Sequence, residues 1–478
     1  MSPMDASVNP RFAPRRSILV AALAVLVAAG AWPLASAAEP VEAAPKPGRP
    51  FVARPTRSLA DLPDLPVDGP LDRFGGAGAP AARGTGFFRT ERVAGRWWLV
   101  DPNGGMFISR GMNSVTPVPT QGGRAALAAR FGDEAGWTSA TARQLHDAGF
   151  NTTGAWSDHD RLARAEPRLA TCRLWSFMAH YGTKRGGTFM QAGHVGYPND
   201  CPFIFDPEFP AFCREHAQQL AAGRDDPWLL GHFSDNEMPW SRKLLEKYLE
   251  QPETDPGHRA ARAWLAERRP GGAAAAITDA DRIAFLEHAM DTYLSTVAAA
   301  IRAHDPNHLF LGVRLHAPAF DLPEVYRAVG RHCDVVSVNY YGAWTPHPAQ
   351  MAMWAGESGR PFMVTEHYTK GEDSGMGNTG GAGWLVRTQL DRGRFYQNFA
   401  LGLLESRHCV GWHWHRYADN DPDDTKADPS NRDSNKGIVS ARYEPWQPLI
   451  EEMAAFNNRV HGIIAGLDAI PPAPATRP

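Results

Sequence analysis

Strand-like runs recur eight times along this chain, and stretches whose apolar residues follow helical spacing separate them. The runs, each rich in β-branched or aromatic residues, are 106–113, 150–156, 173–177, 229–234, 309–315, 334–340, 361–365 and 409–414. Segments such as 134–148, 283–304 and 389–407 show the helical spacing. Because strands that alternate with helices form parallel sheets, the pattern predicts a (β/α)8 TIM barrel, an α/β fold, with long βα loops.

A separate strand pair precedes the first barrel strand. Residues 86–104 contain two alternating runs around the turn Ala94-Gly95, and a second turn follows at Pro102-Asn103-Gly104. Such a pattern is typical of a β-hairpin. We expect this N-terminal hairpin to plug the bottom of the barrel.

The beginning of the chain has the features of an export signal. Arg11, Arg15 and Arg16 precede an apolar stretch at 18–29, and small residues follow at 35–38. The apolar stretch is shorter than the roughly 20 residues that a membrane span requires. We therefore expect a cleaved signal peptide, a periplasmic or extracellular protein, and no stable membrane span after cleavage. The Arg15-Arg16 pair leaves the export route open.

The predicted division of the chain follows from these segments. Residues 1–38 form the signal peptide, 39–83 a Pro/Ala-rich linker or surface strap, 84–465 the barrel domain, and 466–478 a Pro-rich tail.

Charge and cysteine content exclude several classes of protein. The formal net charge is −3 and no block of Lys or Arg occurs, so we expect no nucleic-acid partner. Five cysteines make an odd number, in which Cys201 and Cys213 are either the most plausible disulfide or two buried thiols. The chain has no CxxC pair and no HExxH motif. We expect no metal ion and no cofactor.

Two glutamates stand at the ends of predicted barrel strands. Asn236-Glu237 follows the strand at 229–234, and Glu366 follows the strand at 361–365. Catalytic groups of this fold lie at the C-terminal ends of the strands. Retaining glycosidases need one carboxyl to protonate the leaving oxygen and a second, about 5 Å away, to attack the anomeric carbon. The pair predicts this chemistry, although Glu237 alone would also suit a helix N-terminus.

The surroundings of each glutamate indicate its role. Glu237 precedes Met238-Pro239-Trp240, a less polar setting of the kind that raises the pKa of a proton donor. Glu366 must stay ionised to act as a nucleophile, and we expect hydrogen-bond donors or cations beside it. The candidates are His367, Tyr340 and Arg110. Of the adjacent Tyr340 and Tyr341 we expect one at the site, with Tyr340 as the candidate, and rim packing of both is the alternative.

Further residues near the strand ends are candidates for substrate binding. Asn236 suits a hydrogen bond to the sugar hydroxyl next to the anomeric centre. Arg110 and Asn113 suit substrate oxygens, with a barrel-interior ion pair as the alternative for Arg110. The remaining candidates, each with core or surface packing as its alternative, are His316, Trp156, and the indoles of Trp412 and Trp414, which alternate with His413 and His415.

Three long segments follow predicted strands and are expected to border the site. Residues 241–275 form a charged, Ala-rich helical insertion that we expect to be part of a lid, and the Gly-rich 371–383 has the composition of a mobile loop. Residues 419–435 are rich in Asp and Asn. Their spacing fails the EF-hand pattern, so a polar loop at the cleft is favoured over a calcium site.

Four motifs resemble the β-agarases and their relatives. They are Gly-Arg-Trp-Trp-Leu-Val-Asp-Pro-Asn-Gly (95–104), Ser-Arg-Gly-Met-Asn-Ser-Val (109–115), His-Phe-Ser-Asp-Asn-Glu (232–237) and Val-Thr-Glu-His-Tyr (364–368). The resemblance covers residues 86–460. It implies a retaining clan A glycoside hydrolase with Glu237 as acid/base and Glu366 as nucleophile, acting on a galactose-containing polysaccharide or oligosaccharide. The alternatives are an inactive glycan-binding barrel and a polysaccharide lyase.

Overall fold

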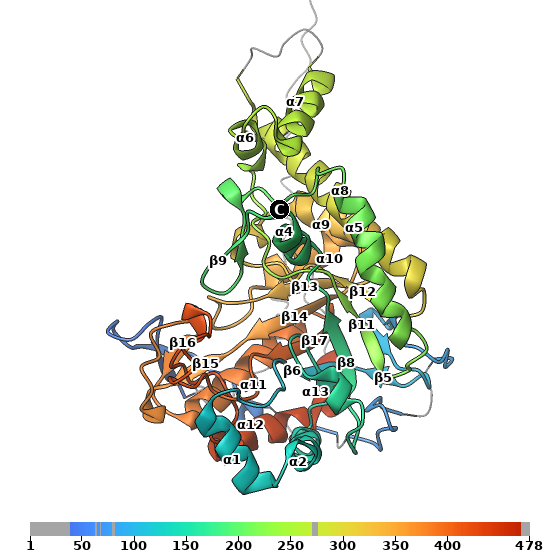
Figure 1. Cartoon of the computed structure of the whole chain (residues 1–478). Coiled ribbons are helices and arrows are strands. Elements are labelled where there is room, and N and C mark those ends of the chain that lie inside the picture. Colours follow the sequence, from blue (N-terminus) through green and yellow to red (C-terminus); the bar gives the residue numbers. More distant parts are fainter. Residues whose placement is uncertain (1–38, 63–64, 67, 79–81, 270–275, 470–478) are drawn as a thin grey trace, which may run out of the picture.

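The computed structural model describes residues 39–469 apart from 63–64, 67, 79–81 and 270–275 (Figure 1). The predicted signal peptide at 1–38 and most of the predicted tail lie outside this range. Within it, no helix has both the length and the apolar character needed to cross a membrane.

Eight parallel strands form a ring at the centre of the molecule (Figure 1). In chain order they are β6 (Ser109–Met112), β7 (Thr152–Thr153), β8 (Ala170–Leu174), β11 (Leu229–Phe233), β12 (Leu309–Gly312), β13 (Val336–Asn339), β14 (Phe362–His367) and β17 (Cys409–Trp414). Each strand pairs with its neighbour, and β17 pairs with β6. A parallel bridge between Leu315 and Val338 joins β12 to β13. The ring is therefore a barrel of the predicted class.

Helices follow the strands around the outside of the barrel. They are α1 (Gln121–Phe131), α2 (Glu134–Asp147), α3 (His159–Leu162), α4 (Phe177–Arg185), α5 (Phe209–His216), α6 (Leu244–Leu249), α7 (Pro256–Arg268), α8 (Asp279–His304), α9 (Pro323–His332), α10 (Pro348–Ser358), α11 (Gln389–Glu405), α12 (Gln447–Asn457) and α13 (Val460–Asp468).

The longest helix, α8, shows why the sequence folds this way. The Thr278 side chain accepts a hydrogen bond from the Asp281 backbone, and the Asp281 carboxylate accepts one from the Thr278 backbone, so both ends of a capping box are present. The helix then buries one apolar face, which includes Phe285, Met290 and Leu294. Burial of that face, more than helix propensity, holds α8 against the barrel.

A three-stranded antiparallel sheet precedes the barrel. It is formed by β3 (Arg89–Val93), β4 (Arg96–Val100) and β5 (Met106–Phe107). At the β3–β4 turn, Ala94 and Gly95 have φ angles of 49° and 83°, as a two-residue hairpin turn requires. Side chains of this sheet, such as Leu99 and Phe107, share an apolar cluster with barrel-strand residues such as Leu230. The sheet thus packs against the inner strands.

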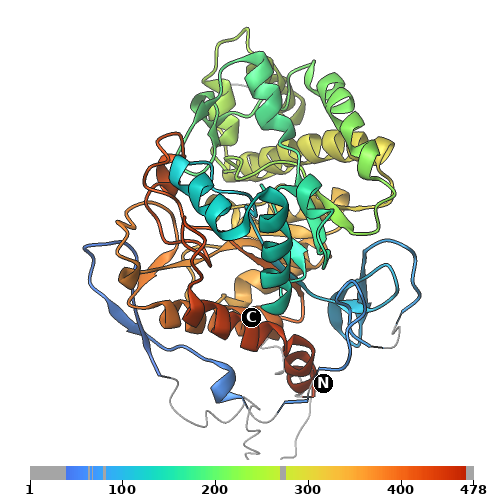
Figure 2. The same cartoon turned by 60° about the horizontal axis from the view of Figure 1, so that its bottom comes forward.

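The segment predicted as a linker or strap takes part in a sheet. Strand β1 (Val41–Ala44) pairs with β2 (Val52–Arg54) and with β16 (Trp384–Val386), which in turn pairs with β15 (Thr369–Gly371). Figure 2 shows this blue N-terminal segment along the edge of the molecule, beside orange chain. Lys46, just after β1, is thereby held near the ends of the barrel strands.

One local prediction was wrong, and one open question about the cysteines is answered. The third barrel strand is β8, three residues earlier than the predicted 173–177, because Phe177 begins α4 and is buried there. For Cys201 and Cys213 the structure shows the second of the two alternatives, a pair of separate buried thiols, with Cys213 on α5. Burial raises the pKa of the Cys201 thiol to about 12.

Candidate active site

Glu237 and Glu366 line one cavity of about 710 Å³ at the C-terminal ends of the barrel strands. Glu366 is the fifth residue of β14 and is only 6% exposed. Glu237 follows β11 with a φ of 51°, a left-handed conformation that costs free energy for a residue other than glycine. The barrel therefore brings the two predicted carboxylates together, and Glu237 is held in a strained backbone conformation.

Arg314 and Tyr341 hold the Glu366 carboxylate. The Tyr341 hydroxyl donates to Oε2 over 2.6 Å, and Arg314 Nη2 lies 2.9 Å from Oε1. Burial raises the pKa of Glu366, while the Arg314 charge and the Tyr341 hydrogen bond act to lower it. Both donors favour the ionised carboxylate that a nucleophile requires.

Arg314 also binds Asn236, the residue before Glu237. Its Nη1 donates to Asn236 Oδ1 over 2.6 Å, and Asn339 Nδ2 donates to the same oxygen over 3.0 Å. Asn339 Nδ2 also lies 2.9 Å from Glu237 Oε1. One guanidinium and one amide thus connect the Asn236-Glu237 pair to Glu366.

His194 contacts the other oxygen of Glu237. Its Nδ1 lies 3.6 Å from Oε2, and it comes from the loop between β9 (Phe189–Met190) and β10 (Val195–Gly196). Burial acts to raise the pKa of Glu237, but His194, His316 and Asn339 lower it, and the net pKa is below the ordinary value. The Glu237 charge in turn raises the pKa of Glu366. The two carboxyls therefore influence each other's protonation, and their different contacts distinguish them.

Aromatic rings form part of the cavity wall. Trp156 lines it, is 42% exposed, and has the Arg314 guanidinium 4.4 Å from its ring centroid. His316 and His415 also line the cavity, and the His415 ring packs edge-on against Trp156 at 5.7 Å. Of the predicted binding residues, Trp156 and His316 are thus at the cavity.

Loops complete the rim. Ala192–His194, Gly381–Ala382 and Ser430–Asn431 line the cavity, so the predicted 371–383 and 419–435 loops do border it. The Gly193 backbone donates to Asp428 Oδ2 over 2.7 Å, which connects two of these loops. The described part of 241–275 contributes no lining residue, and α6 and α7 lie at one end of the molecule (Figure 1). The prediction of a lid at 241–275 is therefore wrong, and the 189–196 segment borders the cavity instead.

Tyr340 does not reach the cavity. Its hydroxyl donates to Gln350 Oε1 over 2.7 Å and accepts from the His347 backbone. The neighbouring Tyr341 bonds Glu366 instead. The prediction of Tyr340 at the site is therefore wrong, and the hydroxyl donor to Glu366 is its neighbour.

Arg110, Asn113 and His367 are buried away from the lining. Arg110 Nε donates to the Gly149 carbonyl and Asn113 Nδ2 to the Thr365 carbonyl, so both side chains bond backbone inside the fold. The His367 ring stacks on Phe399 at 4.7 Å. The predicted cation beside Glu366 is Arg314 and not Arg110.

The indoles of Trp412 and Trp414 face the helices. Trp412 Nε1 donates to Tyr396 on α11, and Trp414 Nε1 donates to the Lys436 carbonyl. The alternating His413 and His415 therefore point inward, and only His415 reaches the cavity. The predicted indole floor is wrong because the inward face of β17 belongs to the histidines.

Several site residues were not singled out from the sequence. They are Arg314, Asn339, His194, His415, Tyr368, Arg416, Lys436 and Lys46. Arg314 and Asn339 carried a usable signal, because each is a polar residue at the end of a strand-like run, as Glu237 is.

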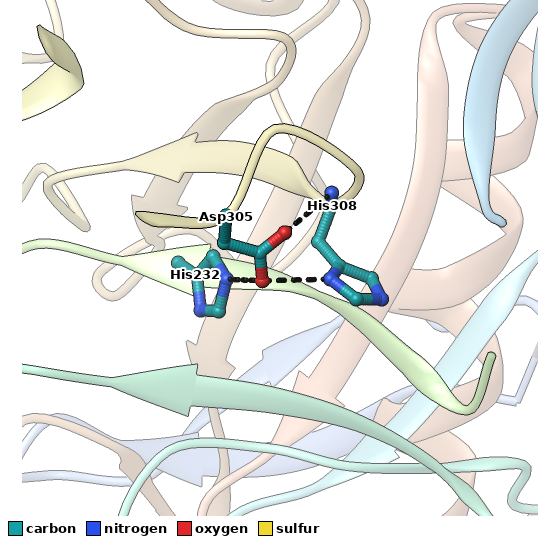
Figure 3. A group of neighbouring side chains, drawn as sticks. All are labelled: His232, Asp305 and His308. Atoms are coloured by element: carbon teal, nitrogen blue, oxygen red, sulfur yellow. Dashed lines mark hydrogen bonds and ion pairs between the residues drawn. The ribbon is translucent and has the colours of Figure 1, made fainter. Parts of the chain in front are cut away.

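One cluster of metal-ligand type lies elsewhere, at the N-terminal end of β12. Figure 3 shows Asp305 between the rings of His232 and His308, and its Oδ2 is 2.8 Å and 2.7 Å from their nitrogens. Trp175 Nε1 donates to the other nitrogen of His232. The second nitrogen of His308 lies 2.9 Å from the Asp226 carbonyl. Hydrogen bonds therefore engage every ring nitrogen, and the cluster has the geometry of a buried hydrogen-bonded group.

Paired carboxylates at these strand ends of a barrel define the site as that of the glycoside hydrolase class. The structure of BpGH50 is 30% identical in sequence, covers 89% of this chain and 95% of that one, and has a TM-score of 0.79. The chain belongs to glycoside hydrolase family 50.

Other relatives are more distant. β-Agarase B of Vibrio sp. (strain JT0107) is 25% identical over 85% of this chain, and β-agarase A of the same strain is 24% identical over 77%. The chain spans about half the length of these two agarases, 51% and 45% respectively. The structure of an exo-β-agarase shares the fold, with a TM-score of 0.70 at 20% identity, over 85% of this chain and 70% of that one. No protein family model matches the chain.

Proposed function

We propose that this protein is an exported retaining β-glycosidase of the agarase type, which hydrolyses a galactose-containing polysaccharide or oligosaccharide by double displacement. The observation that carries the proposal is the Glu366 carboxylate, fixed by Arg314 and Tyr341 in the same cavity as Glu237.

In the first step Glu366 attacks the anomeric carbon while Glu237 gives its proton to the glycosidic oxygen. The bond between the anomeric carbon and that oxygen breaks, the leaving sugar departs with the proton, and a glycosyl ester forms on Glu366. In the second step Glu237 takes a proton from water. The water oxygen attacks the anomeric carbon, and the ester bond to Glu366 breaks.

The residues around the pair have parts in this scheme. Asn236 Oδ1 accepts hydrogen bonds from Arg314 and Asn339. The amide NH2 of Asn236 is therefore left to donate a hydrogen bond to a sugar hydroxyl. Trp156 offers an indole face to a sugar ring. The cavity volume of about 710 Å³ suits a short stretch of sugar units.

Substrate and location rest on different observations. The names of the Vibrio relatives support an agarose-type galactan as the substrate. The Arg residues, apolar stretch and small residues within 1–38 support export to the periplasm or beyond the cell. The assignment to clan A stays a prediction.

The test is reducing-sugar release from agar, porphyran, other galactans, β-glucan, mannan and uronic-acid polysaccharides. Wild type is compared with Glu366→Ala, which we expect to be inactive because no glycosyl ester can form. Release of as much reducing sugar by Glu366→Ala as by wild type would contradict the proposal. A new absorbance from an unsaturated product would identify a lyase, and binding without any turnover a glycan-binding barrel.

A further inference from the structure

Cationic residues outnumber carboxylates in the lining of the cavity. Among its described lining residues, Lys46, Arg416 and Lys436 are cationic, whereas Glu237 and Glu366 are the acidic ones. Glu366 already has Arg314, which is not counted in that lining, at 2.9 Å. Glu366 and Lys436 also act on each other electrostatically. Three lining cations and Arg314 therefore face two carboxylates, and the cavity carries an excess of positive charge.

Arg416 is a cation without a counterion. It follows β17, and no ion pair of its guanidinium with a described residue occurs; its buried Nε also has no hydrogen-bond partner there. Asp419 and Asp424 are near enough to act on it electrostatically, but neither forms an ion pair with it. Asn435, Trp446 and the Gly437 backbone donate to Asp419, and two backbone N–H groups donate to Asp424. A partly buried charge left unpaired costs free energy, and a ligand anion would remove that cost.

Lys436 is held at the cavity by neutral groups. It is 2% exposed, and its Nζ donates to the Ser430 carbonyl over 2.9 Å and to Asn431 Oδ1. The same nitrogen lies 4.9 Å from the centroid of the Tyr368 ring. An ammonium group has three donors, so one remains for a ligand. Burial, followed by the nearby Arg416 charge, lowers the pKa of Lys436 to about 7, although the charges of Glu366 and Asp428 act to raise it.

The two cations are neighbours. The Arg416 backbone lies 3.4 Å from the Lys436 carbonyl, and their charges repel each other through a buried region. Lys46 stands at the rim, where its Nζ donates to the Gly381 carbonyl. A concave site in which cations outnumber carboxylates, and in which one guanidinium forms no ion pair with a described residue, is typical of a site for an anion.

We propose that the cavity binds a sugar unit that carries a negatively charged substituent, a sulfate ester or a carboxylate, and that Arg416 and Lys436 determine this specificity. The inference rests on the proposed function, because it names the substrate class of the same site.

Calorimetric titration of the full chain tests it. The inactive Glu366→Gln protein is titrated with galactan oligosaccharides of equal length that are neutral, sulfated, or contain one uronic acid. The same titrations are made with Arg416→Gln and Lys436→Gln added. Lys426→Gln is the control, because this exposed lysine belongs to the same loop but does not line the cavity. Circular dichroism verifies that each variant is folded.

We expect one anionic ligand to bind at least about tenfold more tightly than the neutral one, in line with a charged hydrogen bond. Arg416→Gln should remove most of that preference, and Lys426→Gln none of it. The sulfated and uronic-acid ligands show which anion is preferred. Equal binding of all three ligands, or a preference that survives in Arg416→Gln, would overturn the inference.

Hydrolysis by wild type separates this inference from the proposed function. Turnover of galactan without any anionic preference overturns the inference alone. An anionic preference that disappears in Arg416→Gln, with no hydrolysis of any galactan, overturns the proposed function alone.

Discussion

Arg314 lies 2.9 Å from Glu366, although Arg314 follows β12 and Glu366 belongs to β14, two strands that are not adjacent in the barrel. The same guanidinium bonds Asn236, so one side chain spans the interior from β12 toward both carboxylates. Side chains that cross a barrel in this way fix the relative position of reacting groups.

Arg314→Lys should therefore damage catalysis even though it keeps the positive charge. A lysine ammonium cannot reach Asn236 and Glu366 together as the planar guanidinium does. We expect kcat to fall about 10²-fold, the cost of one lost preorganised donor. Kinetics on the best galactan measures it, with Arg302→Lys, whose partner is the His332 carbonyl, as the control. An unchanged kcat in Arg314→Lys would contradict this role.

The adjacent tyrosines form a matched pair of variants. Tyr341→Phe removes the hydroxyl that donates to Glu366, and we expect kcat to fall at least tenfold, because a hydrogen bond to a charged group is worth about 1.5–3 kcal/mol. Tyr340→Phe removes only the contacts with Gln350 and the His347 backbone. It should lower the free energy of unfolding by about 1 kcal/mol with little change in kcat. A large fall in kcat for Tyr340→Phe, with an unchanged kcat for Tyr341→Phe, would contradict these two roles.

His194→Ala should shift the pH profile. The acid form of Glu237 is the one that reacts first, so activity falls as pH rises through its pKa. Because His194 lowers the pKa of Glu237, its removal should raise that pKa and move the alkaline limb of kcat/KM to higher pH. Measurement of kcat/KM against pH tests this, with the exposed His146→Ala as control. An alkaline limb that stays in place or moves down would contradict the assignment.

Asp305→Asn should destabilise the fold. Asp305 accepts from two buried histidines, and removal of one member of such a group costs about 3 kcal/mol. Burial acts to raise the pKa of Asp305, but the histidines lower it below its ordinary value. Its stabilising effect is therefore full above that ordinary value and lost as pH falls through the folded pKa. Urea unfolding at decreasing pH should show that the difference in the free energy of unfolding between wild type and Asp305→Asn becomes smaller. A rise in wild-type Tm on adding zinc would contradict the hydrogen-bonded description.

Much of the barrel was predictable because its strands are buried on both faces and read as continuous apolar runs. The boundaries of β17 matched the predicted 409–414, whereas β8 began earlier because Phe177 joins a helix. Glu237 and Glu366 were recognisable as polar residues at strand ends. The 189–196 segment carried no comparable signal, because its place over Glu237 depends on a loop contact with Asp428.

Side-chain direction at the strand ends was less predictable. Strict alternation fails where the register shifts, as between Val338 and Asn339 in β13. Just beyond that shift Tyr341, and not Tyr340, reaches Glu366. On β17 the alternation holds, but only the structure shows that His413 and His415 occupy its inward face.

The covalent role of Glu366 is tested most directly by trapping the intermediate. With a 2-deoxy-2-fluoro galactoside that has an activated leaving group, the enzyme should form the glycosyl ester quickly, and water should hydrolyse this ester slowly. Mass spectrometry of proteolytic peptides should then place one sugar on the peptide that contains Glu366, and the label should be absent from Glu366→Ala. A label on any other residue of wild type, or turnover of the reagent with no label, would contradict the account.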